Sequence, residues 1–187
     1  MILRELKNTP RLYHFVVLGA CLSWLSGCAG LSDYACTLQE SRAQSSDLGT
    51  HYRYTAPPDG NTQLPRGTSV KVTRYSVTFN VERIEPCTTL SIIKEITLLR
   101  GSDNNIVIKE TREFYAEDGT LIATLSEDLT SQFGRSGQYT AVVPLPIPRK
   151  APAGRYRILS RLTLEHRGDK HTQLLSAAEA SFAIIPR

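Results

Sequence analysis

The sequence predicts an all-β fold, an antiparallel β-sandwich of seven or eight strands that occupies residues 69–187. From Ser69 onward, apolar and polar residues alternate in most segments, which is typical of strands with one buried face. Turn-forming residues separate these segments at intervals of about 8–12 residues, a spacing common in sandwiches. With 41% hydrophobic residues, the chain is also apolar enough to build a core.

The first strand is predicted around Tyr75–Val81, where apolar residues occupy every second position. Val70 and Val72 have the opposite parity, so a bulge or break is expected near Thr73-Arg74.

A second strand and a hairpin follow. Leu90–Leu98 is a regular strand except for Lys94, a charged residue on its apolar face. Ile106–Tyr115 and Leu121–Leu125 form the hairpin, and Asp118-Gly119 between them is a strong signal for a two-residue turn.

Three further strands complete the prediction. Gln138–Val143 leads into residues 144–148, Pro-Leu-Pro-Ile-Pro, whose missing N–H donors exclude a central strand and favour an extended edge or a polyproline connection. Tyr156–Leu164 alternates well, and Leu174–Ile185 ends the chain, although the alanines of residues 177–180 leave a helix possible there.

The stretch Ala151–Ile158 resembles the start of the penultimate strand in immunoglobulin-like and fibronectin-like domains. In that pattern a small residue and then a tyrosine, here Tyr156, open the strand, and the tyrosine anchors a corner. Pro152 stands where Asp is common, and Ile158 stands where antibody domains have their second cysteine. The resemblance implies an immunoglobulin-like sandwich without the antibody disulfide, and it implies no function.

The N-terminus has the pattern of an export signal. Residues 1–11 carry three basic residues and one acid, and the apolar run of residues 12–25 is too short to cross a bilayer, which takes about 20 residues. Leu25-Ser26-Gly27-Cys28 resembles the lipobox of bacterial lipoproteins. That resemblance implies cleavage of a signal peptide, residues 1–27, and lipidation of Cys28. An uncleaved interfacial helix, or a chance match within an ordinary signal peptide, would be the alternatives.

Residues 28–68 are interpreted as the lipidated N-terminus and a polar tether, with one short helix around Cys36–Ala43. Within the tether, residues 51–54 (His-Tyr-Arg-Tyr) are expected to lie along the domain surface rather than to form a binding strip. The resemblance to proteobacterial lipoproteins also bears on sorting: in them an Asp after the lipidated cysteine implies retention in the inner membrane, whereas Ala29 follows Cys28 here. We therefore expect anchoring in the bacterial outer membrane, on its periplasmic face.

Removal of residues 1–27 leaves 187 − 27 = 160 residues with 19 basic and 17 acidic side chains, a net charge of +2. A chain this close to neutral gives no case for nucleic-acid binding. The remaining cysteines, Cys36 and Cys87, are predicted to form a disulfide, because the periplasm is oxidising. Two free thiols are the alternative.

No pattern indicates catalysis or a cofactor. The histidines His51, His166 and His171 lack metal-ligand spacing, although the last two could meet across a hairpin. Residues 134–137 lack the spacing of a serine-hydrolase elbow. The most notable acids are interpreted as solvated charges; they are Glu110, Glu113, Glu117, Asp118, Glu127 and Asp128. The chain is therefore predicted to be non-catalytic and to hold neither a metal nor a cofactor.

One cationic stripe is a candidate ligand site. Alternation places Arg155, Arg157 and Arg161 on one face of a strand, where they could contact an anionic envelope ligand such as lipopolysaccharide or peptidoglycan. The solvent face of a sheet is the simpler interpretation. The leading functional hypothesis is an accessory or assembly factor that binds another envelope protein. Ligand binding by the stripe is the alternative, and a hydrolase with an unrecognised site is a third.

Overall fold

The structure is a computed structural model, and it describes residues 36–37, 49–56, 64–169 and 171–186. The predicted signal peptide, Cys28 and most of the tether lie outside the described residues. Cys36 and Thr37 are helical, as the predicted short helix requires. Within the described ranges, no helix combines the length and hydrophobicity needed to span a membrane.

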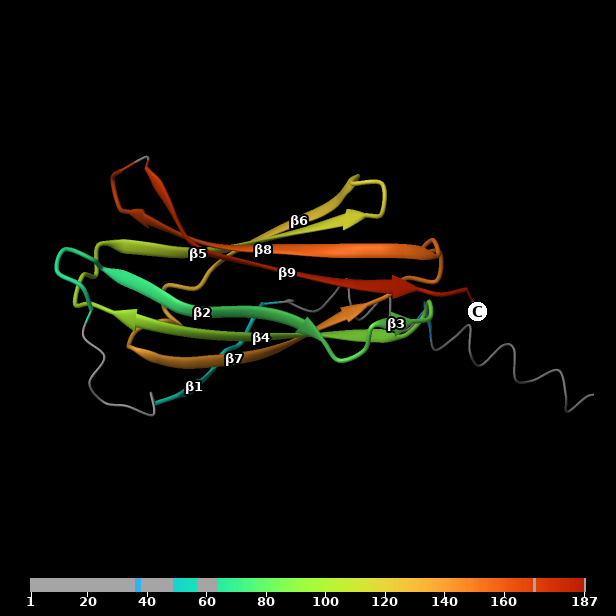
Figure 1. Cartoon of the computed structure of the whole chain (residues 1–187), viewed down its shortest axis with the longest axis horizontal. Helices are drawn as coiled ribbons and strands as arrows, with labels where there is room; N and C mark the ends of the chain where they lie inside the picture. Colours follow the sequence, from blue (N-terminus) through green and yellow to red (C-terminus); the bar gives the residue numbers. More distant parts are fainter. Residues whose placement is uncertain (1–35, 38–48, 57–63, 170, 187) are drawn as a thin grey trace, which may run out of the picture.

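Nine strands in the described part of the chain form two packed sheets (Figure 1). The first sheet has the order β1 (Arg53–Thr55), β7 (Gly137–Pro146), β4 (Thr89–Arg100), β2 (Val70–Phe79). The second has the order β3 (Arg83–Ile84), β9 (Thr172–Ile184), β8 (Gly154–His166), β5 (Ile106–Ala116), β6 (Leu121–Asp128). All pairs are antiparallel except β3 with β9.

This arrangement confirms the predicted all-β, immunoglobulin-like sandwich. Seven of the strands are long. Among them β2, β4 and β7 belong to one sheet, and β9, β8, β5 and β6 are consecutive neighbours in the other. The count exceeds the prediction because β1 and β3, of three and two residues, are too short to show a period. Tyr156 anchors the predicted corner, since its hydroxyl donates to the Pro152 carbonyl at 2.7 Å.

Local predictions have mixed outcomes. The register of β2 shifts between Val72 and Arg74, as the change of parity predicted. The final segment is a strand, β9, so the helical alternative for residues 177–180 is wrong. The β5–β6 turn is also corrected: Ala116 pairs with Thr120, so the loop has three residues and ends in Gly119 at φ +84°. A glycine in this left-handed position lets the chain close a bulged turn.

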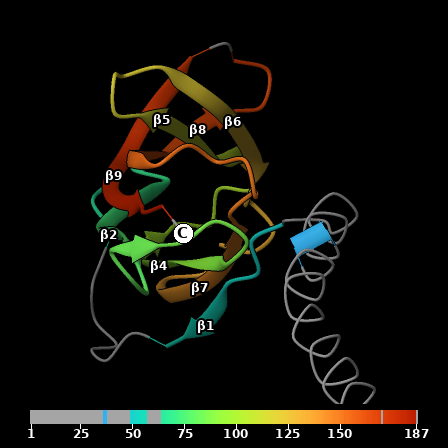
Figure 2. The same ribbon diagram turned by 90° about the vertical axis from the view of Figure 1, so that its right-hand side faces the viewer.

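The core fills the space between the sheets, but the two long sides differ. On one side β2 and β9 approach each other (Figure 2), and the rings of Phe79 and Phe182 meet edge-on at 5.0 Å. On the other side β6 is the outermost strand of its sheet, and in the described part of the chain the outer edge of β7 pairs only with the short β1. The sandwich is therefore less completely closed on this side. Leu129 and Phe133, in the β6–β7 connection, are fully buried and seal one end of this side.

Part of the predicted tether belongs to the sandwich. Residues 53–55 pair with the start of β7, and Tyr52 and Tyr54 pack against Phe133 and Tyr139, with ring centroids 5.0 and 5.4 Å apart. The domain boundary predicted at Ser69 is therefore too late for this segment. A three-residue strand is recognisable only by the edge that it pairs with, which lies more than eighty residues away.

The approach of β1 depends on Gly137. A Cβ at this position would collide with the Tyr54 ring and would lie 2.8 Å from the Thr55 carbonyl oxygen. We expect Gly137→Ala to lower the free energy of unfolding by about 1–3 kcal/mol, because β1 must move away from β7. Thermal unfolding measures the loss, and amide exchange at residues 53–55 locates it. Gly134→Ala is the matched control, since a Cβ at Gly134 meets nothing within 4 Å; equal losses in both variants would contradict the explanation.

Candidate functional site

A cluster of charged side chains lies inside the sandwich. Lys94 of β4 and Glu110 of β5 have no exposed side-chain surface, and their Nζ and Oε2 atoms are 2.6 Å apart. The hydroxyl of Tyr75 donates to Glu110 at 2.7 Å, and Ser160 donates to the same carboxylate oxygen at 2.8 Å. The backbone carries these groups inward because each one takes a core-facing place in the alternation of its strand.

A second ion pair extends the cluster to the open side. Arg112, which is almost completely buried, donates to Glu127 of β6 at 3.0 Å. Thr50 lies over this pair, and its backbone N–H donates to the other oxygen of Glu127 at 2.6 Å. The segment before β1 therefore covers the charged half of the open side.

The electrostatics keep the inner pair charged at neutral pH. Burial lowers the pKa of Lys94 to about 8, against the opposing effect of Glu110. Burial would raise the pKa of Glu110, but Lys94, Tyr75 and Arg112 together hold it below its ordinary value. Side chains with no exposed surface do not reach a substrate, so the arrangement suits a structural role in the core.

The interpretation of all the acids as solvated charges is thus wrong for Glu110. Ile106, Ile108 and Glu110 share one face of β5, and this face is buried from Ile106 to Arg112. The alternation of the sequence already placed Glu110 on the buried face of β5. It likewise placed Lys94, a charged residue, on the apolar face of β4. Around the cluster and elsewhere in the described residues, no group of three His, Cys, Asp or Glu side chains is placed to hold a metal ion.

An apolar groove of about 560 Å³ occupies the remaining half of the open side. Its walls come from β6 and from the end of β7 with the segment that follows it, and residues of β5, β8 and β9 complete its lining. The main contributors are Ile122, Leu125, Leu145, Ile147, Tyr156 and Phe182. Among the described residues that line it, Tyr156 has the only polar side chain, and its hydroxyl is already bonded to Pro152. The sequence analysis noted only the proline-rich residues 144–148, as an extended edge or connection, because the groove is formed by residues from five strands.

The outer edge of β6 is a second exposed feature. In the described part of the chain β6 pairs only with β5, and it contains no proline. Leu121, Ile122 and Leu125 are exposed by 51%, 54% and 39%. A long edge with exposed apolar residues is unusual, since proteins normally protect such edges against pairing with another chain.

The arginine stripe lies where alternation predicted it, but its charges are largely compensated. Arg157 forms an ion pair with Glu179 of β9 at 3.4 Å, and Arg161 forms one with Glu113 of β5 at 2.8 Å. Arg155 is exposed. The stripe is therefore a surface of cross-strand ion pairs, which is ordinary for the solvent face of a sheet.

Among the described residues the three histidines belong to no group that could hold a metal ion, although the pairing of Glu165 with Thr172 leaves His166 and His171 on either side of the same hairpin turn. His51, His166 and His171 are all exposed, and His166 lies 3.6 Å from Asp103. The backbone N–H of His171 is bonded to Asp169 within the β8–β9 turn.

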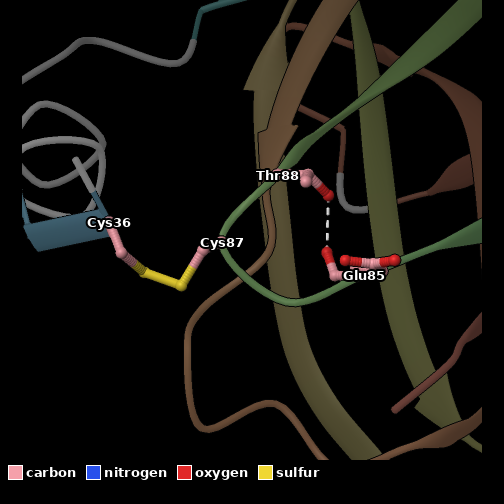
Figure 3. Close-up of a disulfide and its surroundings, with 4 residues drawn as sticks. All are labelled: Cys36, Glu85, Cys87 and Thr88. Carbon is pink, nitrogen blue, oxygen red and sulfur yellow. Dashed lines mark hydrogen bonds between the residues drawn. A yellow bond between two sulfur atoms is a disulfide. The ribbon is translucent and has the colours of Figure 1, made fainter. Parts of the chain in front are cut away.

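The predicted disulfide between Cys36 and Cys87 is present (Figure 3). Cys87 lies in the loop between β3 and β4, where its N–H donates to the Ile147 carbonyl at 2.9 Å. Ile147 in turn donates to the Thr88 carbonyl at 2.8 Å. The bridge thus fastens the N-terminal segment beside a wall of the apolar groove.

These features define the chain as an immunoglobulin-like β-sandwich with a buried ion-pair cluster and an apolar groove. No protein-family model matches the sequence, and no curated protein matches it. Similar solved structures include the C-terminal domain of wzt, with 7% identity, a TM-score of 0.43 and coverage of 73% of this chain and 78% of that one. The CARDB domain of the PF1109 protein from Pyrococcus furiosus has 12% identity and a TM-score of 0.37, with 63% and 94% covered.

A family 123 glycoside hydrolase from Clostridium perfringens has 12% identity and a TM-score of 0.38. The match covers 60% of this chain but only 23% of the hydrolase. All three similarities concern the β-fold.

Proposed function

We propose that the chain is a non-catalytic lipoprotein of the bacterial envelope, anchored by lipid at Cys28 to the periplasmic face of the outer membrane. Its sandwich acts as an accessory or assembly factor that binds an extended segment of another envelope protein. The observation that carries this proposal is the edge of β6, which is eight residues long, exposed and free of proline. Strand addition to such an edge supplies main-chain hydrogen bonds, and the exposed side chains supply specificity.

The direction of the backbone groups on β6 identifies the residues to test. The N–H of Leu129 donates to Ile108 of β5, so by alternation the N–H groups of Thr124 and Ser126 face the free edge. A proline at either position removes an outward donor and keeps the ladder to β5.

The proposed edge contact predicts a clear difference between two double variants. Lipidated protein is used to capture partners from gently solubilised envelopes. A stoichiometric protein is expected with the wild type and with Thr124→Ala/Ser126→Ala, and it is expected to be lost with Thr124→Pro/Ser126→Pro. Amide exchange at residues 124 and 126 of the wild type should slow in the purified complex.

Two outcomes would contradict this proposal. Undiminished capture by the proline variant would show that β6 is not the contact, and unchanged exchange at both amides would show the same in the complex. Melting curves of both variants verify that each one is folded.

A further inference from the structure

The apolar groove has the chemistry of a site for a hydrocarbon chain. Its volume of about 560 Å³ lies within the range of about 300–1,000 Å³ that is typical of small-molecule pockets. Its single hydroxyl is already bonded within the protein. A polar ligand would bury donors and acceptors there without partners, which is unfavourable. An acyl chain has no such groups.

The wall formed by β7 excludes a peptide strand. The backbone groups of Ile147 bond to the β4 side, so by alternation residues 144 and 146 face the open side. Both are prolines and have no N–H to donate, whereas β1 pairs only with residues 138–140. This half of the edge therefore cannot form a regular ladder with an added strand. The β7 side of the groove and the backbone edge of β6 are consequently different kinds of surface.

The N-terminal attachment places the groove near a membrane. Cys36 is bonded to Cys87, whose N–H donates to groove-lining Ile147. Cys28 precedes Cys36 by eight residues, which span at most about 26–29 Å when fully extended. A lipid anchor at Cys28 therefore keeps this end of the sandwich within that distance of the bilayer surface.

The charges beside the groove indicate which lipid supplies the chain. Arg149 and Lys150 are exposed at the tip of the turn between groove-lining Pro148 and Ala151. Glu117, at the same end, accepts the Arg155 backbone N–H at 3.3 Å. Two exposed cations suit an anionic headgroup. The acylated terminus and glyceryl group expected on Cys28 carry no charge, so they offer these cations no counterpart.

We propose that the groove binds one acyl chain of an anionic membrane lipid, whose headgroup lies against Arg149 and Lys150. The proposal rests on the proposed anchor for its access to the membrane. It adds a lipid-binding site to a domain whose proposed protein contact is on β6.

The mature chain suits a fluorescence test because it contains no tryptophan: the one tryptophan of the sequence, Trp24, precedes Cys28 and would be removed with the signal peptide. Ile122→Trp places a reporter in the groove at a position that is 54% exposed, so the fold should tolerate it. Leu174→Trp is the matched control: it is 57% exposed, it does not line the groove, and it is eight residues of β9, about 26 Å, from groove-lining Phe182. Lipidated protein is reconstituted in vesicles of phosphatidylglycerol and phosphatidylethanolamine with dibrominated acyl chains.

We expect strong quenching of the tryptophan reporter at position 122 and little quenching of the control. Arg149→Ser/Lys150→Ser should reduce the quenching several-fold, and so should replacement of phosphatidylglycerol by phosphatidylcholine. Absence of quenching at position 122, or equal quenching at both positions, would overturn the proposal.

A Cys28→Ala version separates this proposal from the anchor when it is exported with an ordinary cleavable signal peptide in place of residues 1–27, because its mature form then carries neither the lipid nor Trp24. If it leaves the membrane fraction and its groove reporter is still quenched by free dibromostearate, both proposals are supported. If it stays in the membrane fraction, the anchor is wrong, while quenching at position 122 still tests the groove. If dibromostearate quenches only the unlipidated protein and brominated vesicles fail to quench the lipidated one, the chain on Cys28 itself fills the groove, which overturns the assigned source.

Discussion

Replacing Lys94 with methionine is expected to lower the free energy of unfolding by about 3–5 kcal/mol at pH 7, because it leaves the buried carboxylate of Glu110 without its closest cation. For a domain of this size, that loss corresponds to a fall of roughly 10 °C in the melting temperature. Chemical denaturation measures the free energy, and a thermal scan measures the melting temperature.

The double variant Lys94→Met/Glu110→Leu is the decisive comparison. Replacing both members of a buried ion pair by apolar residues is often neutral or stabilising. The neighbours keep partners, since Tyr75 and Ser160 hydroxyls lie 2.5 Å apart and Arg112 retains Glu127. We therefore expect most of the lost stability to return. A double variant no more stable than Lys94→Met would contradict this account.

The same pair predicts a dependence on pH. In the wild type the folded pKa of Glu110 is below its unfolded value of 4.5, so its stabilisation is complete above that pH and is lost as the pH falls through the folded pKa. In Lys94→Met, burial dominates and raises the folded pKa of Glu110, so stability falls as the pH rises above 4.5. The difference between the two proteins should therefore shrink toward acid, and a cost that is the same at pH 4 and pH 7 would indicate a simple packing defect.

Removing the disulfide is expected to have an effect of similar size. The bridge joins residues 51 positions apart, and closing a loop of this length restricts the unfolded chain by about 4 kcal/mol. Cys36→Ser/Cys87→Ser should unfold at a correspondingly lower denaturant concentration than the oxidised wild type. The reduced wild type is the matched control, since it should behave as the double variant does. Identical unfolding of oxidised and reduced wild type would contradict the prediction.

The sandwich was predictable because its long strands show a clear alternation of apolar and polar residues and are separated by turn-forming residues. The parity of the apolar residues predicted the bulge near Thr73, and the expectation of an oxidising compartment predicted the disulfide. The buried cluster was harder to predict, since the identities of Lys94 and Glu110 do not show whether these side chains face water or each other. A buried charge is distinguished from an exposed one only by its inward-facing position in the alternation of its strand. That Lys94 meets Glu110 becomes clear only once β4 and β5 are placed opposite each other in the sandwich.

The groove could not be predicted in the same way. It exists because the pairing of β1 with β7 begins only at Arg53, opposite Thr140, so that in the described part of the chain the outer edge of the proline half of β7 has no strand beside it. Nothing local to Ile122 or Phe182 reveals this gap, because it depends on where a distant segment begins to pair. The sequence did predict an extended edge or connection for residues 144–148, whose prolines surround Leu145 and Ile147 on the β7 side of the groove.

The position of the disulfide also decides how the protein bears mechanical tension. If a partner pulls the domain away from a lipid at Cys28, the force passes from Cys36 through the bridge into the loop between β3 and β4. β1 lies within the closed loop between the two cysteines, so the pull bypasses it. With the bridge reduced, the same pull would act along residues 37–52 and would peel β1 from β7, exposing Tyr52 and Tyr54. Oxidation thus lets the three-residue strand β1 remain in place while the anchor is under tension.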